Sequence, residues 1–151
     1  MKPHNIYKKR DDYTTPKEAF EFIFKHIPRD KIVYDPFFCE GDSGKFMKEL
    51  GINCIHEDSD FFINDISFDI ILTNPPYSIK KKVIDKCLSL KKPFALLLPV
   101  ETIERLYLHN VQFTLLIPKK RYSFKYGNGN PPFKTCWFLF GFNLSKQIIY
   151  E

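Results

Sequence analysis

FDIILTNPPYS, at residues 68–78, is the stretch that decides the fold class of this chain. Its first half is an apolar run of the kind found in a strand that is buried on both faces of a parallel sheet. A polar-Pro-Pro-aromatic segment follows directly, and open α/β sheets bind their ligands at the carboxyl ends of such strands. The stretch therefore predicts an α/β fold with a ligand site at Asn74, Pro75, Pro76 and Tyr77. The alternative is that the two prolines only end a strand.

The rest of the chain alternates predicted strands with predicted helices. Strands are predicted at residues 31–34, 52–56, 68–73, 93–99, 112–117 and 135–142, and helices from residue 16 on and at 43–50, 79–90 and 101–108. Thr15 is the predicted N-cap of the first helix, and Glu18 completes a capping box. This order implies a mostly parallel sheet with right-handed crossovers. Because no helix separates the last two strands, they predict an antiparallel hairpin at one edge.

Length and composition narrow the class of protein. The 151 residues, 44% of them hydrophobic, match the size of one domain, so residues 1–151 are expected to form a single domain. We expect no membrane span and no secretion signal, because the apolar runs are only strand-length. The four cysteines are scattered singly, so we expect no metal site and a reduced, intracellular setting.

The basic residues gather in three short runs. These runs lie at residues 8–10, 80–82 and 119–121, in a chain of formal net charge +5. Aromatic residues accompany them, namely Tyr7, Tyr13, Tyr77, Tyr122, Phe124 and Tyr126. Stacking on bases and contact with phosphates need such interleaving, so the pattern indicates a nucleic-acid surface. Three ordinary solvated loops are the alternative.

The residue types at positions 74–77 suit chemistry on an amine attached to a ring. Such an amine is a poor nucleophile because its lone pair is delocalised. Hydrogen bonds from the amine to the Asn74 side-chain oxygen and the Pro75 carbonyl would stabilise the positive charge that develops as the nitrogen reacts. The prolines stiffen the loop, and Tyr77 offers a flat face to a base that has been swung out of a helix.

The loop after the first predicted strand is acidic. Gly41 and Gly44 permit a tight turn against a ligand, but neither the G-x-x-x-x-G-K-[ST] spacing nor G-x-G-x-x-G is present. Asp35, Glu40 and Asp42 instead suit a cationic ligand, such as a sulfonium with an amino-acid tail. An ordinary acidic turn is the alternative.

Acidic residues also end the second predicted strand. Glu57 or Asp58 stands where doubly wound nucleotide folds place a ribose-binding carboxylate, and Glu57 is the preferred candidate. Asp60 and Phe61 are candidates to hold an adenine ring of the same ligand. A solvated acidic turn is again the alternative.

Together these segments resemble the amino-methyltransferases with a D-P-P-Y-type motif, above all the N6-adenine DNA methyltransferases. Asn74-Pro75-Pro76-Tyr77 is similar to that motif, and Asp35-Pro36-Phe37 with Gly41 and Gly44 is similar to motif I. Tyr13-Thr14-Thr15-Pro16 resembles the N-terminal cofactor motif, and residues 119–124 resemble the motif beside the flipped base. The resemblance implies a Rossmann-like fold that transfers a methyl group from S-adenosylmethionine to the N6 amine of adenine in DNA.

The resemblance assigns residues to three roles. The residues expected to act on the target amine are Asn74, Pro75, Pro76 and Tyr77. Those expected to bind the cofactor are Tyr13, Thr14, Thr15, Asp35, Pro36, Phe37, Gly41, Glu57, Asp58, Asp60, Phe61 and Asn74. Those expected to contact nucleic acid are Lys80, Lys119, Lys120, Arg121 and Phe124.

Two departures from the family keep other functions open. Between Asp58 and Phe68 there is no room for the usual helix and strand, so the sheet is expected to lack one edge strand. Cys39 and Glu40 stand where motif I usually has small residues, which leaves a pseudoenzyme as an alternative. Enzymes that methylate rRNA bases or protein glutamine carry a similar motif, so RNA and protein substrates stay open. A catalytically silent nucleic-acid-binding module is the remaining alternative.

Sequence preference is the property that the length of the chain predicts. A core from residue 15 to residue 142 leaves only the N-terminal arm and the loop at 122–133 to read bases, and each bidentate base contact contributes about 1–3 kcal/mol. We therefore predict that the purified protein methylates adenine with weak sequence preference, or needs a second copy or a specificity subunit. Sequencing of DNA methylated in vitro checks this, and a long, sharp recognition site read by the monomer would contradict it.

Overall fold

A computed structural model describes residues 14–38, 41–124 and 133–151 of the chain. In these residues one seven-stranded sheet has the order β2-β1-β3-β4-β6-β5-β7. The strands are β1 (Val33–Tyr34), β2 (Cys54–Ile55), β3 (Ile70–Thr73), β4 (Phe94–Pro99), β5 (Thr114–Ile117), β6 (Thr135–Phe140) and β7 (Ile148–Tyr150). The helices are α1 (Lys17–Phe24), α2 (Asp42–Glu49) and α3 (Lys80–Ser89), with 3-10 turns η3 (Tyr77–Ile79), η4 (Val100–Glu104) and η5 (Leu106–Leu108).

The strand directions bring several loops to one edge of the sheet. Strands β1 to β4 run parallel to one another, whereas β6 is antiparallel to both β4 and β5. Strand β5 is therefore parallel to β4. The carboxyl ends of β1 to β5 and the amino end of β6 consequently meet at the same edge, which is where open α/β sheets bind ligands.

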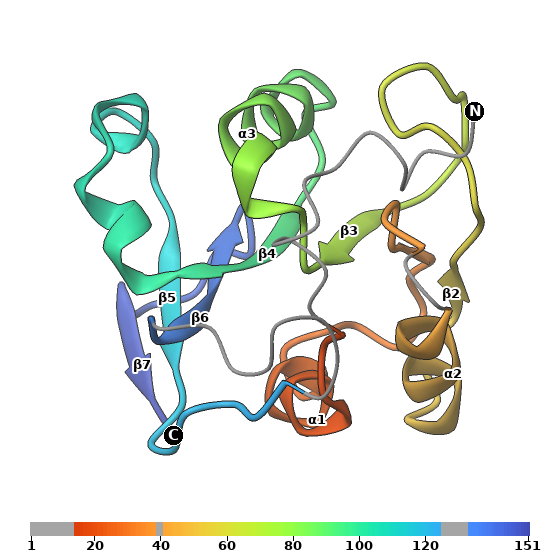
Figure 1. Ribbon diagram of the computed structural model, residues 1–151, viewed down its shortest axis with the longest axis horizontal. Helices are drawn as coiled ribbons and strands as arrows, with labels where there is room; N and C mark the ends of the chain where they lie inside the picture. Colours follow the sequence, from red (N-terminus) through yellow and green to blue (C-terminus); the bar gives the residue numbers. More distant parts are fainter. Residues whose placement is uncertain (1–13, 39–40, 125–132) are drawn as a thin grey trace.

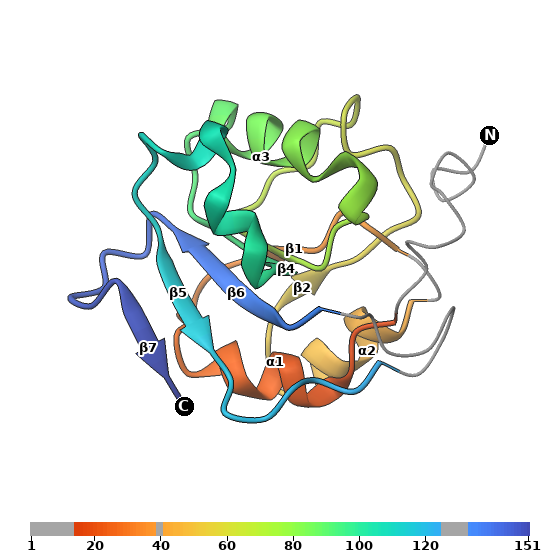
Figure 2. The same cartoon turned by 60° about the vertical axis from the view of Figure 1, so that its left-hand side comes forward.

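The sheet lies between two layers of helix (Figures 1 and 2). Helices α1 and α2 cover one face, and α3 covers the other. Alternate side chains of β4 supply the two cores: Ala95 and Leu97 face α1, and Leu96 and Leu98 face α3. Every residue of β4 is buried, because both faces of the strand are covered. This explains the unbroken apolar run in its sequence.

The predicted α/β fold is confirmed, and so is the missing edge strand, because residues 56–69 contain neither a helix nor a strand. Three details of the prediction were wrong. The hairpin of β5 and β6 is not at the edge, because β7 pairs parallel with β5 outside it. The segment at 101–108 forms 3-10 turns instead of one helix. Thr15 is not the N-cap: Pro16 occupies that position, and no side chain caps α1.

Other features of the described residues bear on function. No helix in these residues is long and apolar enough to cross a membrane, and they contain no cluster of three or more metal-ligating side chains. Cys54, Cys87 and Cys136 are free thiols. Burial raises the pKa of each to about 12, so these three cysteines are poor nucleophiles.

Trp137 ties the sheet to α1. Its side chain is fully buried, and its indole Nε1–H donates to the Ala19 carbonyl at 2.9 Å. We predict that Trp137→Phe lowers the free energy of unfolding by about 1–3 kcal/mol, because a buried acceptor loses its donor. Urea unfolding measures this. Tyr150→Phe is the control, since Tyr150 is 69% exposed and should change stability by less than about 0.5 kcal/mol. Equal effects of the two substitutions would contradict the role of Trp137.

Candidate active site

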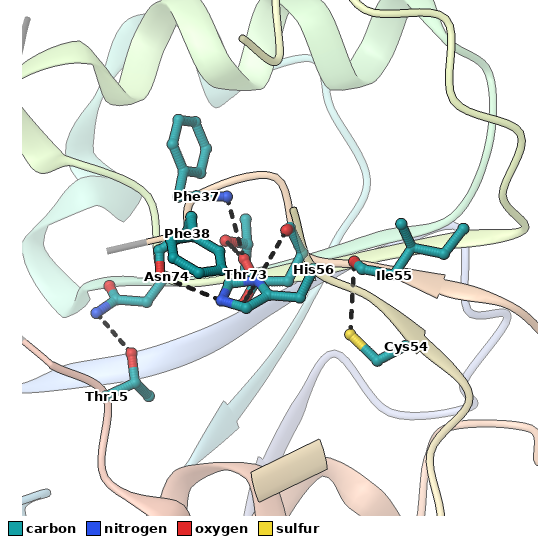
Figure 3. A network of polar contacts seen from close by, with 9 residues as sticks. Thr15, Phe37, Phe38, Cys54, Ile55, His56, Thr73 and Asn74 are labelled. Carbon is teal, nitrogen blue, oxygen red and sulfur yellow. Dashed lines mark hydrogen bonds and ion pairs between the residues drawn. The ribbon is translucent and has the colours of Figure 1, made fainter. Parts of the chain in front are cut away.

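Polar residues from separate segments of the chain converge at the carboxyl edge of the sheet, and two of them, His56 and Thr73, were not among the predicted site residues (Figure 3). Asp35 follows β1, His56 follows β2, Thr73 ends β3 and Asn74 follows it. Thr15 comes from the loop that leads into α1 and contacts Asn74. Neighbouring parallel strands thus bring together Asp35 and Thr73, which lie 38 positions apart, and the loop before α1 adds Thr15, which lies 59 positions from Asn74.

In the Asn74 side-chain amide, the nitrogen is hydrogen-bonded and, within the described part of the chain, the oxygen is not. Its Nδ2–H donates to the Thr15 hydroxyl at 2.9 Å. Its Oδ1 atom is buried and has no hydrogen-bond partner among the described residues. An unsatisfied buried acceptor costs about 1–3 kcal/mol, and such groups concentrate at functional sites. The structure thus holds an oriented acceptor that a donor on a ligand could satisfy.

Aromatic rings lie beside Asn74. Pro75 and Pro76 are buried and continue the chain into η3, which begins at Tyr77. The Tyr77 ring meets the Phe133 ring edge to face, with centroids 5.5 Å apart. Phe133 precedes β6 and is partly exposed, and the sequence analysis missed it. It stands alone next to a glycine-rich and proline-rich loop, and only the position of β6 in the sheet brings it to the site.

Asp35 is held inside the protein. Its side chain is 2% exposed, and its Oδ1 accepts hydrogen bonds from the Thr73 hydroxyl at 2.5 Å and from the Phe37 N–H at 3.3 Å. Burial raises the pKa of the Asp35 carboxyl, and the charge of His56 is the largest influence that opposes this rise. The expectation that Asp35 contacts a cationic ligand stays a prediction, and in this structure the carboxylate is engaged by protein groups. These contacts link the end of β1 to Thr73, to the main chain at Phe37 and to His56.

The loop after β1 is shaped by close contacts. Pro36 and Phe37 are buried. Gly41 has φ +82°, and a Cβ there would lie 3.0 Å from the Phe38 ring, so only glycine fits without strain. The predicted cofactor residue Tyr13 and the atypical motif I residues Cys39 and Glu40 lie outside the described residues.

The segment after β2 is ordered by its own side chains. Glu57 and Asp58 are exposed, whereas the Asp60 Oδ1 accepts the Phe62 N–H at 2.9 Å and closes a turn. Phe61 is 3% exposed, and its ring lies against Tyr34 and Phe37 at 6.2 and 5.7 Å. As the sequence analysis expected, residues 56–69 form neither a helix nor a strand.

A second hydrogen-bonded anchor holds that segment against the sheet. Asn64 Nδ2–H donates to the Tyr34 hydroxyl at 2.6 Å and to the Ser59 hydroxyl at 3.2 Å. The sequence analysis missed Asn64, since nothing in an isolated asparagine indicates its distant partner.

The basic residues predicted to contact nucleic acid reach the same edge. Lys119, Lys120 and Arg121 follow β5 and are exposed. The Arg121 Nη2–H also donates to the Phe133 carbonyl at 2.8 Å, which links this run to the aromatic pair. Lys80 is partly buried and begins α3, directly after η3. The run at residues 8–10 lies outside the described residues.

Phe124, which was predicted to contact nucleic acid, is buried in this structure. It is 5% exposed and packs in the core shared with α1, as does Tyr122. In this structure its ring therefore offers no free face to a base. The apolar periodicity of β5 ended before this segment, so the sequence did not indicate that its aromatic residues fold back onto α1.

Comparison with known proteins gives matches at the level of structure. No family model and no curated protein matches the sequence. A dimethyladenosine transferase from Plasmodium falciparum is similar in structure, with 16% identity and a TM-score of 0.52, over 84% of this chain and 62% of that chain. This chain thus spans less than two thirds of that protein.

Two further solved structures are more distant. A human methyltransferase 10 domain containing protein has 15% identity and a TM-score of 0.44, covering 87% of this chain and 85% of that chain. A tRNA (m1A58) methyltransferase from Aquifex aeolicus has 14% identity and a TM-score of 0.41, covering 89% and 71% respectively. The likeness to the Plasmodium falciparum enzyme places this chain in the Rossmann-like α/β fold of methyltransferases.

The hydrogen bond from Thr73 to Asp35 should stabilise the protein. Thr73→Val keeps the shape but removes a buried donor, so we predict a loss of about 1–3 kcal/mol in the free energy of unfolding. Thr135→Val is the matched control, because Thr135 is also a buried strand residue but its Oγ1 has no partner in the described part of the chain. Its replacement should be neutral or stabilising. Denaturant unfolding measures both, and a Thr73→Val effect no larger than the control would contradict this account.

Proposed function

We propose that this protein transfers a methyl group from S-adenosylmethionine to the exocyclic N6 amine of adenine in nucleic acid, with DNA as the first-choice substrate. The observation that carries the proposal is the Asn74 Oδ1 atom, a buried acceptor without a partner among the described residues. It lies at the carboxyl edge of a Rossmann-like sheet, in the same short segment as the Tyr77 ring.

The Asn74 acceptor suits an amine that must become positively charged. An N–H of the target amine would donate to Oδ1, and the partial negative charge of that oxygen would stabilise the charge that develops on nitrogen. Thr15 holds the amide in place before the substrate arrives, so little reorganisation is needed during the reaction. This arrangement would select a planar amine with a hydrogen to donate.

The rings of Tyr77 and Phe133 suit a base taken out of a helix. Stacking on an aromatic side chain contributes about 1–3 kcal/mol per base, which is comparable with the few kcal/mol that extrusion costs. The two rings come from opposite sides of β4, one after β3 and the other before β6. They would therefore bound the target base from two independent segments.

The residues around the loop after β1 fit the proposed cofactor, which would supply an electrophilic methyl group on a sulfonium. The glycine turn at Gly41 permits close approach to the main chain. The exposed carboxylates of Glu57 and Asp58 stand at the end of β2, where a ribose would be bound. Thr14 and Thr15, Pro36 and Phe37, and Asp60 and Phe61 would line the site from the two flanking loops.

A methyl-transfer assay with labelled S-adenosylmethionine tests the function. The substrates are single-stranded DNA, double-stranded DNA, RNA and a glutamine-containing protein, and the methylated nucleoside is identified by mass spectrometry after digestion. We expect N6-methylated adenine in DNA. Label in RNA alone would show that the substrate is RNA and not DNA. Label in protein or on cytosine would overturn the assignment of adenine. No transfer, with the cofactor bound, would favour a silent binding module.

Asn74 should be required for methyl transfer but not for cofactor binding. We predict that Asn74→Ala lowers kcat by about 10²–10³-fold, the usual loss when a stabilising group is removed from a reaction centre, and leaves S-adenosylmethionine affinity unchanged in calorimetry. Asn74→Asp is the matched variant. One carboxylate oxygen keeps the acceptor for the target amine, and the other replaces Nδ2 and can accept a hydrogen bond from the Thr15 hydroxyl. It should retain much more activity than the alanine variant. Near-normal turnover of Asn74→Ala would contradict the assignment.

Lys119 and Lys120 should contact phosphates. We predict that replacing both with alanine weakens binding of all DNA sequences alike and reduces the slope of log affinity against log salt by about one unit for each lost contact. Arg121 is left unchanged, since it also holds Phe133. Lys31→Ala is the control, because Lys31 is exposed at the opposite edge, before β1. An unaltered salt slope in the double variant would identify these lysines as solvated surface.

A further inference from the structure

His56 packs against the loop that follows β1. The sequence analysis did not identify it as a site residue. Its side chain is 4% exposed. The ring stacks on Phe38 with centroids 5.1 Å apart, and Gly44 leaves the space that the ring fills. A Cβ at position 44 would lie 2.9 Å from His56 Cδ2. The fold thus reserves a close-fitting place for an imidazole at this point.

Both ring nitrogens of His56 face oxygen acceptors. Nδ1 lies 3.0 Å from the Asp35 carbonyl and 3.4 Å from the Asp35 carboxylate, and Nε2 lies 3.1 Å from the Phe38 carbonyl (Figure 3). A main-chain carbonyl can only accept. A neutral imidazole has one N–H, so it could satisfy one of these two contacts and would direct a lone pair at the other carbonyl. Only a ring with a proton on each nitrogen could donate to both carbonyls.

The surroundings of the ring provide one compensating charge. Asp35, at the end of β1, is the charged group that contacts it. On α2, which packs against the ring through Gly44, Asp42 pairs with Lys45 at 3.8 Å, and Lys48 is exposed. Glu57 follows His56 and is exposed. A buried cation needs a partner of opposite charge, and Asp35 is placed to be that partner.

We propose that His56 is held as a doubly protonated imidazolium that positions the loop after β1 at residues 35–38, and that the affinity for S-adenosylmethionine falls when the ring loses a proton. Its two hydrogen bonds fix the main chain at residues 35 and 38, on either side of Phe37. Loss of one proton would release one of these two points and leave Asp35 without a counter-charge. The choice of S-adenosylmethionine as the ligand rests on the proposed function, whereas the inferred positive charge of the His56 ring does not.

Nitrogen NMR of the histidine rings tests the charge without any ligand. The chain has four histidines, and the signals of His56 are assigned from their absence in His56→Gln and His56→Asn. We expect both nitrogens of His56 to be protonated at neutral pH. A neutral ring, with one protonated and one bare nitrogen, would overturn the inference whatever the protein binds.

Calorimetry with S-adenosylmethionine from mildly acidic to alkaline pH tests the positioning role. His56→Gln keeps an N–H near the place of Nε2, and His56→Asn keeps one near Nδ1, so each retains one uncharged contact. At low pH we expect the wild-type protein to bind roughly tenfold or more tightly than either variant, because a charged hydrogen bond is lost. Towards alkaline pH this ratio should fall. The variants lack the imidazole, so the pH dependence of their binding serves as the control for titration of the ligand's own amino group.

The two tests separate the possible failures. A ratio of affinities that stays constant over the whole pH range would overturn the positioning role. A protein that binds no S-adenosylmethionine, but whose His56 is doubly protonated by NMR, would overturn the proposed function and the link to that ligand. The inference that a charged His56 ring holds residues 35 and 38 would still stand.

Discussion

The buried carboxylate of Asp35 is the interaction on which the candidate site depends. It joins three neighbouring strands: it belongs to the end of β1, accepts from Thr73 at the end of β3, and lies beside His56 at the end of β2. A buried charge is tolerated only when it is paired and hydrogen-bonded. The three strand ends must therefore stay in register. This requirement fixes the edge of the sheet from which every other site residue projects.

The same interaction connects the two halves of the site. Thr73, which holds Asp35, is followed directly by Asn74, which is held by Thr15. The end of β3 thus contacts the loop that would bind the cofactor, and the next residue, Asn74, would present its amide oxygen to the target. A methyl group and its acceptor must approach within a narrow range of distances and angles. Because Thr73 and Asn74 are consecutive, the distance between their two contacts can vary little.

The sequence predicted most of the fold because it was locally unambiguous. The apolar run of β3 and its Asn-Pro-Pro-Tyr ending placed Asn74 at the correct edge, and the spacing after Asp58 correctly excluded a further helix and strand. The errors involve contacts between distant segments. Strand β7 is three residues long and mostly exposed, so its pattern is weak, and only its partner β5 makes it a strand.

The site was less predictable than the fold for the same reason. Residue type alone suggested that Asp35 faces a ligand and that Phe124 faces a base, whereas packing buries both. His56 and Phe133 were missed because an isolated histidine or phenylalanine carries no signal. Their importance comes from Asp35, Gly44 and Tyr77, which reach them only after the sheet has formed.

The central claim is that this edge of the sheet binds S-adenosylmethionine, and amide chemical-shift mapping by NMR during a titration with that compound tests it most directly. The account predicts saturable shifts that are largest at residues 37–38, 41–44 and 57–61. The opposite edge of the sheet has a groove of about 300 Å³ lined by Leu88, Phe94 and Phe140, among others, and it should be unaffected. No saturable shift, or shifts confined to that groove, would contradict the account.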